Sequence, residues 1–372
     1  MNKKITLLFV FYIILFLSCS DANDKGDYEL ISPVTVDLTK VPYPKLSDYK
    51  FFKGELKNLS PELNVIPYEP ISSLFSDYAH KKRFVWMPKG TKAVYDGDSK
   101  IIQLPVGAVI IKNFYYDNVQ PNNDTRIIET RLMIKKEDGW LFADYVWNED
   151  QTEAFFDLNG SYVDISWKDE NENIRQVNYR IPSEAQCLVC HKYKETIDGE
   201  YYQYSVPIGL KPQNLNSTLD YGTETKNQLL KWIEVGYLDN NFTLPSQENT
   251  VVNYNDSSKP LELRVRSYFD INCAHCHSET GHCDYRPMRF PFSETKNNLT
   301  NMGVCVNTQD LQDFPPELNK IITPKNINES MLFYRINTTN EAYRMPLHGR
   351  TLIHTEGVLL IKNWINSLEN CN

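Results

Sequence analysis

Long hydrophobic runs are almost absent from this chain of 372 residues. The longest mostly apolar run, Ile5–Leu17, is shorter than the ~20 residues that a membrane-spanning helix needs. Apolar residues nevertheless make up 41% of the chain, which is ordinary for a globular protein and enough for a sizeable core. The sequence therefore excludes a protein with several membrane-spanning helices and indicates a globular fold.

Basic residues are also in short supply. The chain has 39 Lys and Arg residues against 48 Asp and Glu residues, a formal net charge of −9. A phosphate-binding surface needs clustered Lys and Arg residues, so the composition argues against nucleic acid as a partner. An acidic surface would instead steer the chain towards a basic partner protein.

The first residues are typical of an export signal rather than of folded structure. Lys3 and Lys4 form a positive segment ahead of the apolar run. The end of the run resembles a bacterial lipobox, which implies acylation of Cys19; a plain secretory signal with a chance Cys is the alternative. We expect a lipoprotein signal peptide at 1–18 and a polar tether at 19–42. The lipid would anchor the protein on the periplasmic side of a membrane or at the outer membrane or cell surface.

Strand patterns follow the tether. Aromatic residues make up 12% of the chain, and they favour pleated, half-buried surfaces. The turn that ends in Gly139 is a hairpin signal, because glycine adopts a positive φ readily. We expect an antiparallel meander of five strands, at 108–116, 126–135, 140–147, 161–167 and 174–181.

Helical patterns dominate after residue 181. Apolar residues recur at helical spacing in several segments. We expect helices at 182–187, 225–235, 261–270 and 355–368. The fold class is therefore predicted to be α+β. A β-rich domain at 43–247 would end in a helical segment that carries chemistry, a polar linker would follow at 248–260, and an all-α domain would occupy 261–372.

A short cysteine motif, C-x-x-C-H, occurs twice. The copies are Cys187-Leu188-Val189-Cys190-His191 and Cys273-Ala274-His275-Cys276-His277. Two thiols at this spacing can each add to one vinyl group of a haem, and the adjacent His then reaches the iron as its proximal ligand. With only 8 Cys and 7 His in the chain, chance does not account for two copies. The sequence predicts two covalently bound haem c groups, held by Cys187, Cys190, Cys273 and Cys276 and ligated by His191 and His277.

Zinc and redox thiols are the rival interpretations of these cysteines. Zinc ribbons place about 15–20 residues between their two Cys pairs, whereas Cys190 and Cys273 are 83 positions apart. A redox motif would need only one pair in a βαβ context. The predicted export also agrees with haem, because thioether attachment takes place outside the cytoplasm.

Met345 is the candidate distal ligand of the second haem. It lies in a polar loop, before Pro346, after the second motif and ahead of the last expected helix. Small cytochromes c place a ligating Met there, and a Met that fills the core is the alternative. No Met lies between His191 and His277. The sixth ligand of the first haem therefore stays open between an upstream residue such as His80, a more distant histidine such as His275 or His348, and an open coordination site.

Three further cysteines can pair in an oxidising compartment. Cys283 and Cys305 could close a short span beside the second haem, which would leave Cys371 over. The alternative pairs Cys371 with one of these two, and sequence alone does not decide between them.

Several strings resemble those of a family of bacterial diheme c-type cytochromes, mostly uncharacterised lipoproteins. They are Leu46-Ser47-Asp48-Tyr49, Leu74-Phe75-Ser76-Asp77-Tyr78-Ala79, Pro105-Val106-Gly107, Glu129-Thr130-Arg131-Leu132, Tyr145-Val146-Trp147-Asn148 and Asn272-Cys273-Ala274-His275-Cys276-His277. The resemblance implies haem and electron transfer over nearly the whole mature chain. The second half is similar to a small His/Met cytochrome c domain. The first half weakly resembles the cytochrome P460 and cytochrome c′-β group, in which Lys112 is the nearest counterpart of a haem-linked lysine; an exposed strand lysine is the alternative.

The function expected from these features is electron transfer outside the cytoplasm by a membrane-anchored diheme cytochrome with a redox partner protein. No residue is assigned a catalytic role. The alternative is a haem enzyme or sensor whose first haem binds peroxide, nitric oxide or a similar small ligand. A cell-surface binding module is a third hypothesis, but no binding signature supports it.

Overall fold

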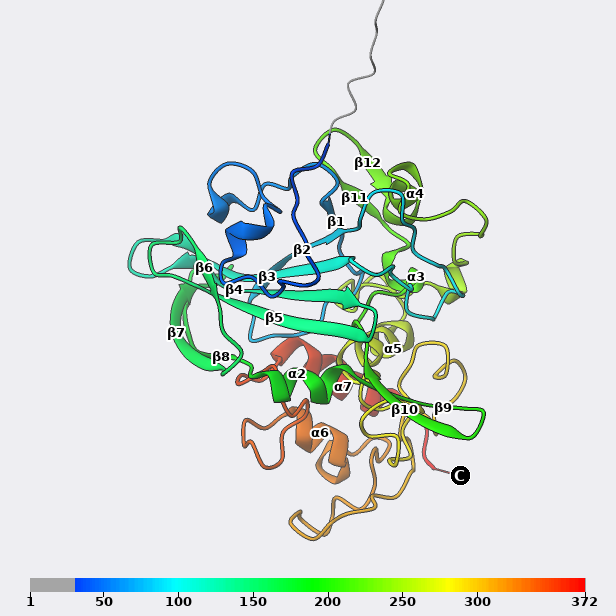
Figure 1. The fold of residues 1–372 in the computed structure, drawn as a ribbon. Helices are drawn as coiled ribbons and strands as arrows, with labels where there is room; N and C mark the ends of the chain where they lie inside the picture. Colours follow the sequence, from blue (N-terminus) through cyan, green and yellow to red (C-terminus); the bar gives the residue numbers. More distant parts are fainter. Residues whose placement is uncertain (1–30, 372) are drawn as a thin grey trace, which may run out of the picture. The chain divides into compact units, whose positions relative to one another are not determined.

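One large antiparallel sheet dominates the first half of the chain (Figure 1). The computed structural model describes residues 31–371, so Cys19 and the predicted signal peptide lie outside the described residues. The sheet contains eight strands: β1 (Ile66–Pro67), β2 (His80–Trp86), β3 (Val109–Val119), β4 (Asp124–Lys136), β5 (Gly139–Trp147), β6 (Ala154–Phe156), β7 (Ser161–Lys168) and β8 (Ile174–Ile181). Each of the five predicted strands is present, with ends shifted by a few residues.

The simple meander was only partly right. Strands β1 to β6 are neighbours in sequence order, but β7 pairs with the end of β3, at Val119 and Trp167, and with β8. Register shifts in β3 after Phe114 and after Tyr116 interrupt its ladder with β4, and such irregularities bend and twist a strand. The ring of Tyr116 then packs against Trp167 at 4.8 Å between centroids. The β7–β8 hairpin therefore joins the sheet at the far end of β3 and does not extend it beyond β6.

Helices and two small hairpins make up the rest of the described structure. The α-helices are α2 (Glu184–His191), α3 (Pro212–Leu215), α4 (Gln228–Glu234), α5 (Leu261–Asn272), α6 (Met331–Ile336) and α7 (Thr355–Ser367). The 3-10 helices are η2 (Leu46–Tyr49), η3 (Leu56–Asn58), η4 (Gln247–Asn249) and η5 (Ile327–Glu329). The hairpins pair β9 (Lys192–Ile197) with β10 (Glu200–Ser205), and β11 (Thr218–Asp220) with β12 (Thr225–Asn227). The fold is α+β, as predicted.

The two faces of the sheet carry different cores. One row across β2–β5 contains Val85, Ile110, Met133 and Phe142, and it packs in a cluster with Trp232 of α4. The next row, whose side chains alternate to the opposite face, packs instead with Tyr49 and Phe51. The face that bears Phe142 is the one that reaches the first cysteine motif, because Cys187 packs against the same cluster.

The described secondary structure of residues 261–371 consists of helices, turns and isolated bridges. Helices α5 and α7 share one core, in which Phe269 and Trp364 meet edge to face at 5.8 Å between ring centroids. Residues of the predicted linker are packed: Val251 and Tyr254 are buried, and the Tyr254 hydroxyl donates to the Ser73 carbonyl at 2.8 Å. Residues Pro33–Asn372 form one compact unit. The division of this unit into two domains stays a prediction.

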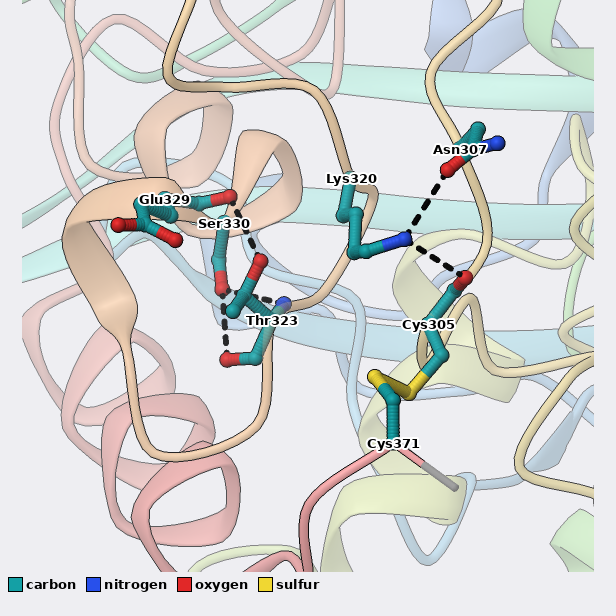
Figure 2. The surroundings of a disulfide bond; sticks show 7 residues. All are labelled: Cys305, Asn307, Lys320, Thr323, Glu329, Ser330 and Cys371. Carbon is teal, nitrogen blue, oxygen red and sulfur yellow. Dashed lines mark hydrogen bonds between the residues drawn. A yellow bond between two sulfur atoms is a disulfide. The ribbon is translucent and has the colours of Figure 1, made fainter.

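The disulfide expected between Cys283 and Cys305 was wrong. The structure joins Cys305 to Cys371, with 5.8 Å between their Cα atoms, and leaves Cys283 as a buried free thiol (Figure 2). The alternative pairing of Cys371 is therefore the one observed. Lys320 lies beside the bond and donates to Asn307 at 3.0 Å. The fold brings the C-terminal Cys to Cys305 because α7 packs back onto the core of α5.

Breaking this disulfide is expected to lower the free energy of unfolding by roughly 4 kcal/mol in the chain-entropy account, because the bond closes a loop of 66 residues. Urea unfolding of Cys371→Ser against the unmodified chain measures the loss. Cys283→Ser removes a thiol that has no disulfide partner and serves as the matched variant. An equal midpoint for Cys371→Ser and the unmodified chain would show that the bond contributes nothing.

Candidate functional site

The first cysteine motif lies on α2, as predicted. A capping box starts this helix. The Ser183 side chain accepts a hydrogen bond from the Gln186 N–H, and the Gln186 side chain accepts one from the Ser183 N–H at 3.3 Å. Residues four positions apart share one helical face. The helix therefore places Cys187 and His191 on the same side, towards the sheet.

His191 is fixed by a hairpin that the sequence analysis missed. Immediately after α2 the chain forms β9 and β10, joined at Asp198 and Gly199, both with positive φ, as a type I′ turn requires. The hairpin returns Val206 to the motif, where its carbonyl lies 2.7 Å from His191 Nδ1. Burial lowers the pKa of His191 to about 4, so the ring is neutral. When Nδ1–H donates to the Val206 carbonyl, Nε2 carries the free electron pair that can bind a metal.

The second cysteine motif follows α5 directly. Cys273 is the C-cap of that helix, and the chain then makes a tight turn in which the His277 N–H donates to the Cys273 carbonyl at 2.9 Å. The His277 ring meets Phe290 edge to face at 5.7 Å, and its Nδ1 is buried without a hydrogen-bond partner among the described residues. Burial lowers the pKa of His277 to about 4. Both motif histidines are therefore neutral and able to act as ligands.

The two motifs meet in space. Ligand atoms of Cys190, His275 and Cys276 all lie within 4.8 Å of one another. A hydrogen bond between the two thiols lowers the pKa of Cys190 and raises that of Cys276. The β9 strand supports this junction, because the Lys194 side chain pairs with Asp284 at 2.6 Å. Sequence separation was thus a poor argument against a shared metal, since folding closes the 83-residue gap.

Each motif lines its own cavity. The first cavity is bordered by Cys187, Cys190 and His191, and the second by Cys273, Cys276 and His277. The first cavity has a volume of about 140 Å³ and the second about 270 Å³, and both are partly open to solvent. These volumes are below the roughly 300–1,000 Å³ of pockets that take drug-sized ligands. A large planar group would therefore have to extend into the solvent-open part of each cavity.

One loop serves both cavities. Met345 lines the second cavity together with His277, and its role as a distal ligand stays a prediction. His348 lines the first cavity together with His191. Pro346 borders both. From sequence, His348 was only one of several distant histidines considered for the first haem, and the structure places it in the first cavity.

A frame of hydrogen bonds holds this loop. The Arg350 guanidinium donates to the carbonyls of Met345 at 2.8 Å and Arg335 at 3.1 Å. The buried Asp77 carboxylate accepts from the N–H groups of Thr351 and Leu352, each at 2.7 Å. Asp77 precedes β2, so these bonds tie the loop to the sheet. These hydrogen bonds hold the backbone of Met345 in place at the edge of the second cavity.

A charged row crosses the sheet in the first cavity. Arg83, Lys112, Arg131 and Asp144 are successive register partners on β2, β3, β4 and β5, and all four line the cavity. Lys112 is therefore a cavity residue and not an exposed strand lysine. His80, considered as an upstream ligand, is exposed at the start of β2, near Asp117, and does not line this cavity.

Comparisons with protein-family models, with curated proteins and with solved structures find no match to this chain. Within residues 31–371, no helix has both the length and the apolar character that crossing a bilayer requires.

Proposed function

We propose that this chain is an exported, lipid-anchored c-type cytochrome that carries two covalent haems and transfers electrons outside the cytoplasm. The observation that carries the proposal is the pair of complete C-x-x-C-H motifs, each bordering a separate cavity, with a thiol of one beside a thiol of the other. Membership of the diheme cytochrome family, suggested by the quoted strings, is part of the proposal. The test is the mass of the denatured mature protein, which should include two haems.

The first cavity suits a haem chemically. Its apolar lining includes Ile110, Met133 and Phe142, and a haem is apolar over most of its faces. On the same sheet face, the adjacent row with Arg83 and Lys112 matches the carboxylates that a haem carries. His191, held through Nδ1, presents Nε2 to a metal. The residues present therefore fit the group.

The second cavity suits a haem with two protein ligands. His277 would bind on one side, and the Met345 thioether, which lines the same cavity, would bind on the other. We assign residues 261–372 to a small cytochrome c domain of this His/Met type. The haem, when bound, supplies the reversible one-electron change of iron, and the protein's own residues set its ligation, burial and orientation.

The contact between the motifs supports a relay. Groups attached at Cys190 and Cys276 would begin from sulfur atoms within 4.8 Å of each other. His275, the third member of that cluster, lines both cavities. This arrangement favours passage of electrons between the two sites over two independent sites. The acidic composition favours a basic redox partner protein.

A haem enzyme or sensor is the second candidate function, and the first cavity favours it. Met133, His275 and His348 line that cavity. The same cavity is lined by the charged row, which an electron relay does not require and which therefore favours a small ligand there. Absorption spectra of the reduced protein with added carbon monoxide or nitric oxide discriminate between the two functions. A shift in half of the haem would support the second, and two unreactive haems would support electron transfer.

A metal–thiolate centre is the remaining alternative, because Cys190, His275 and Cys276 could bind one zinc ion. Metal analysis separates the cases. Zinc in the absence of covalent haem would overturn the proposal. Two covalent haems would leave neither Cys190 nor Cys276 as a free thiol for zinc.

The proposed lipid anchor has its own test. Cys19→Ala is expected to move the protein from the membrane fraction to the soluble fraction or to leave it unprocessed, because a Cys with two or three acyl chains anchors stably. Immunoblots of separated fractions measure this, with Cys283→Ala as the matched Cys substitution. An unacylated N-terminus on the unmodified mature protein would refute the anchor.

A further inference from the structure

We propose that Arg83, Lys112 and Arg131 form an anion-binding site inside the first cavity, suited to a carboxylate or a compact oxyanion. The proposal deepens the proposed function and rests on it, because the nearest carboxylates would belong to the first haem itself. The other source of the same chemistry is a free anion, such as nitrite, bound beside that haem.

The geometry of the site comes from strand register. Arg83 is the partner of Lys112, and Lys112 is the partner of Arg131. Opposite residues on adjacent antiparallel strands have Cβ atoms about 4.5–5.5 Å apart and share one face. The three cationic side chains therefore leave the sheet side by side. They line the same cavity as His191.

The protein balances the charges in this row only at Arg131. Arg131 is paired with Glu129, with Nε and Oε2 2.8 Å apart, and Glu129 also accepts from the Tyr179 hydroxyl at 2.6 Å. Arg83 donates to the Ser73 hydroxyl at 2.9 Å. Among residues 31–371, Arg83 has no carboxylate in ion-pair range, and the Lys112 ammonium has neither a hydrogen bond nor an ion pair, only the face of Phe114 at 4.7 Å.

Asp144, at the end of the row, does not neutralise these cations. It is buried, and neither carboxyl oxygen has a hydrogen-bond partner among the described residues. Burial and the neighbouring Glu129 raise its pKa well above the usual range, which makes Asp144 a poor counter-ion for the row. Burial, together with Arg83 and Arg131, lowers the pKa of Lys112. The site thus has more basic side chains than ionised partners.

An excess of buried positive charge destabilises the fold when no anion is bound. A buried cation that lacks a partner loses its hydration and gains nothing in return. A carboxylate or oxyanion among Arg83, Lys112 and Arg131 would restore the missing partner through charge-assisted hydrogen bonds. It would also favour the charged form of Lys112.

The test uses the full chain after its covalent haem has been quantified. The oxidised protein is titrated with sodium nitrite while the haem spectrum is followed, and both midpoint potentials are measured between pH 5 and 8. Lys112→Met removes the charge and keeps an apolar stem, and Lys112→Arg restores the charge. Lys82→Met is the matched control, because Lys82 is exposed on β2 beside Arg83.

Two results support the site and identify its ligand. If a free anion binds, nitrite gives a saturable spectral shift, and Lys112→Met weakens its affinity about tenfold, equivalent to about 1.4 kcal/mol. If haem carboxylates occupy the site, nitrite has no effect, but Lys112→Met lowers one midpoint potential and alters its pH dependence. In either case Lys112→Arg recovers most of the effect.

The proposal is overturned if Lys112→Met matches Lys82→Met in both nitrite affinity and midpoint potentials. A chain without covalent haem would instead refute the proposed function. The site is then tested by calorimetric titration of that chain with nitrite, where equal binding by Lys112→Met and Lys82→Met overturns it.

Discussion

Replacing Cys187 and Cys190 with alanine is expected to reduce the covalent haem content from two groups per chain to one. Both residues border the first cavity, and no other thiol lines it at the C-x-x-C spacing among the described residues. A c-type haem is retained by its thioether bonds even after denaturation, so loss of both thiols removes the attachment. Mass spectrometry of the denatured chain measures the difference directly.

Cys283→Ala is the matched control for that experiment. Cys283 is buried beside the second motif, where its N–H donates to the Cys276 carbonyl at 2.9 Å, yet it belongs to no C-x-x-C-H motif. This variant should keep two haems. If the Cys187 and Cys190 variant also keeps two, the first motif is not an attachment site. If the unmodified chain has none, the cytochrome proposal is wrong.

Substitution of Met345 by alanine is expected to change one haem and spare the other. A thioether ligand stabilises ferrous iron and raises the reduction potential. Met345→Ala should therefore lower one of the two potentials and abolish the weak sulfur-to-iron absorption band of the oxidised protein. The first haem should keep its potential, because Met345 lines only the second cavity. Redox titration followed by absorption measures both effects.

Met331 offers the matched control, because it lines the same cavity but is a buried residue of α6. Met331→Ala should destabilise the fold and leave the sulfur band in place. Should Met345→Ala retain the band and both potentials, Met345 would be a packing residue and the second haem would take another ligand.

Local patterns predicted most of the secondary structure. Aromatic and apolar runs between turn signals located β3, β4, β5, β7 and β8, and the apolar stripe of α7 was found at 355–368. The helix expected from 225 begins at residue 228, because residues 225–227 pair as β12 and the Asn227 side chain caps α4. Pairings that depend on distant residues were harder. The β7 strand joins β3 through Trp167, and Cys371 reaches Cys305, because packing of whole elements decides which neighbours meet.

The candidate site divides in the same way. The cysteines and histidines of the motifs follow from sequence spacing, since adjacent positions carry the chemistry. The partner of His191, the Val206 carbonyl, depends on a hairpin whose signal was the Asp198-Gly199 turn. The row of Arg83, Lys112 and Arg131 requires strand register, and a one-residue slip would have turned these side chains to the other face. His348 enters the first cavity only through the loop that Arg350 and Asp77 hold.

The closeness of Cys190 and Cys276 also constrains biogenesis. A thiolate attacks an accessible disulfide or joins a neighbouring sulfur readily in an oxidising compartment. In the folded chain these two sulfurs lie within 4.8 Å, so a chain that folds before it is loaded would tend to trap itself by cross-linking the two motifs. Under the proposed function, maturation would proceed on a reduced and still open polypeptide, with each haem delivered before the sheet and α5 close around the junction. The protein would then complete its folding only after both haems are attached.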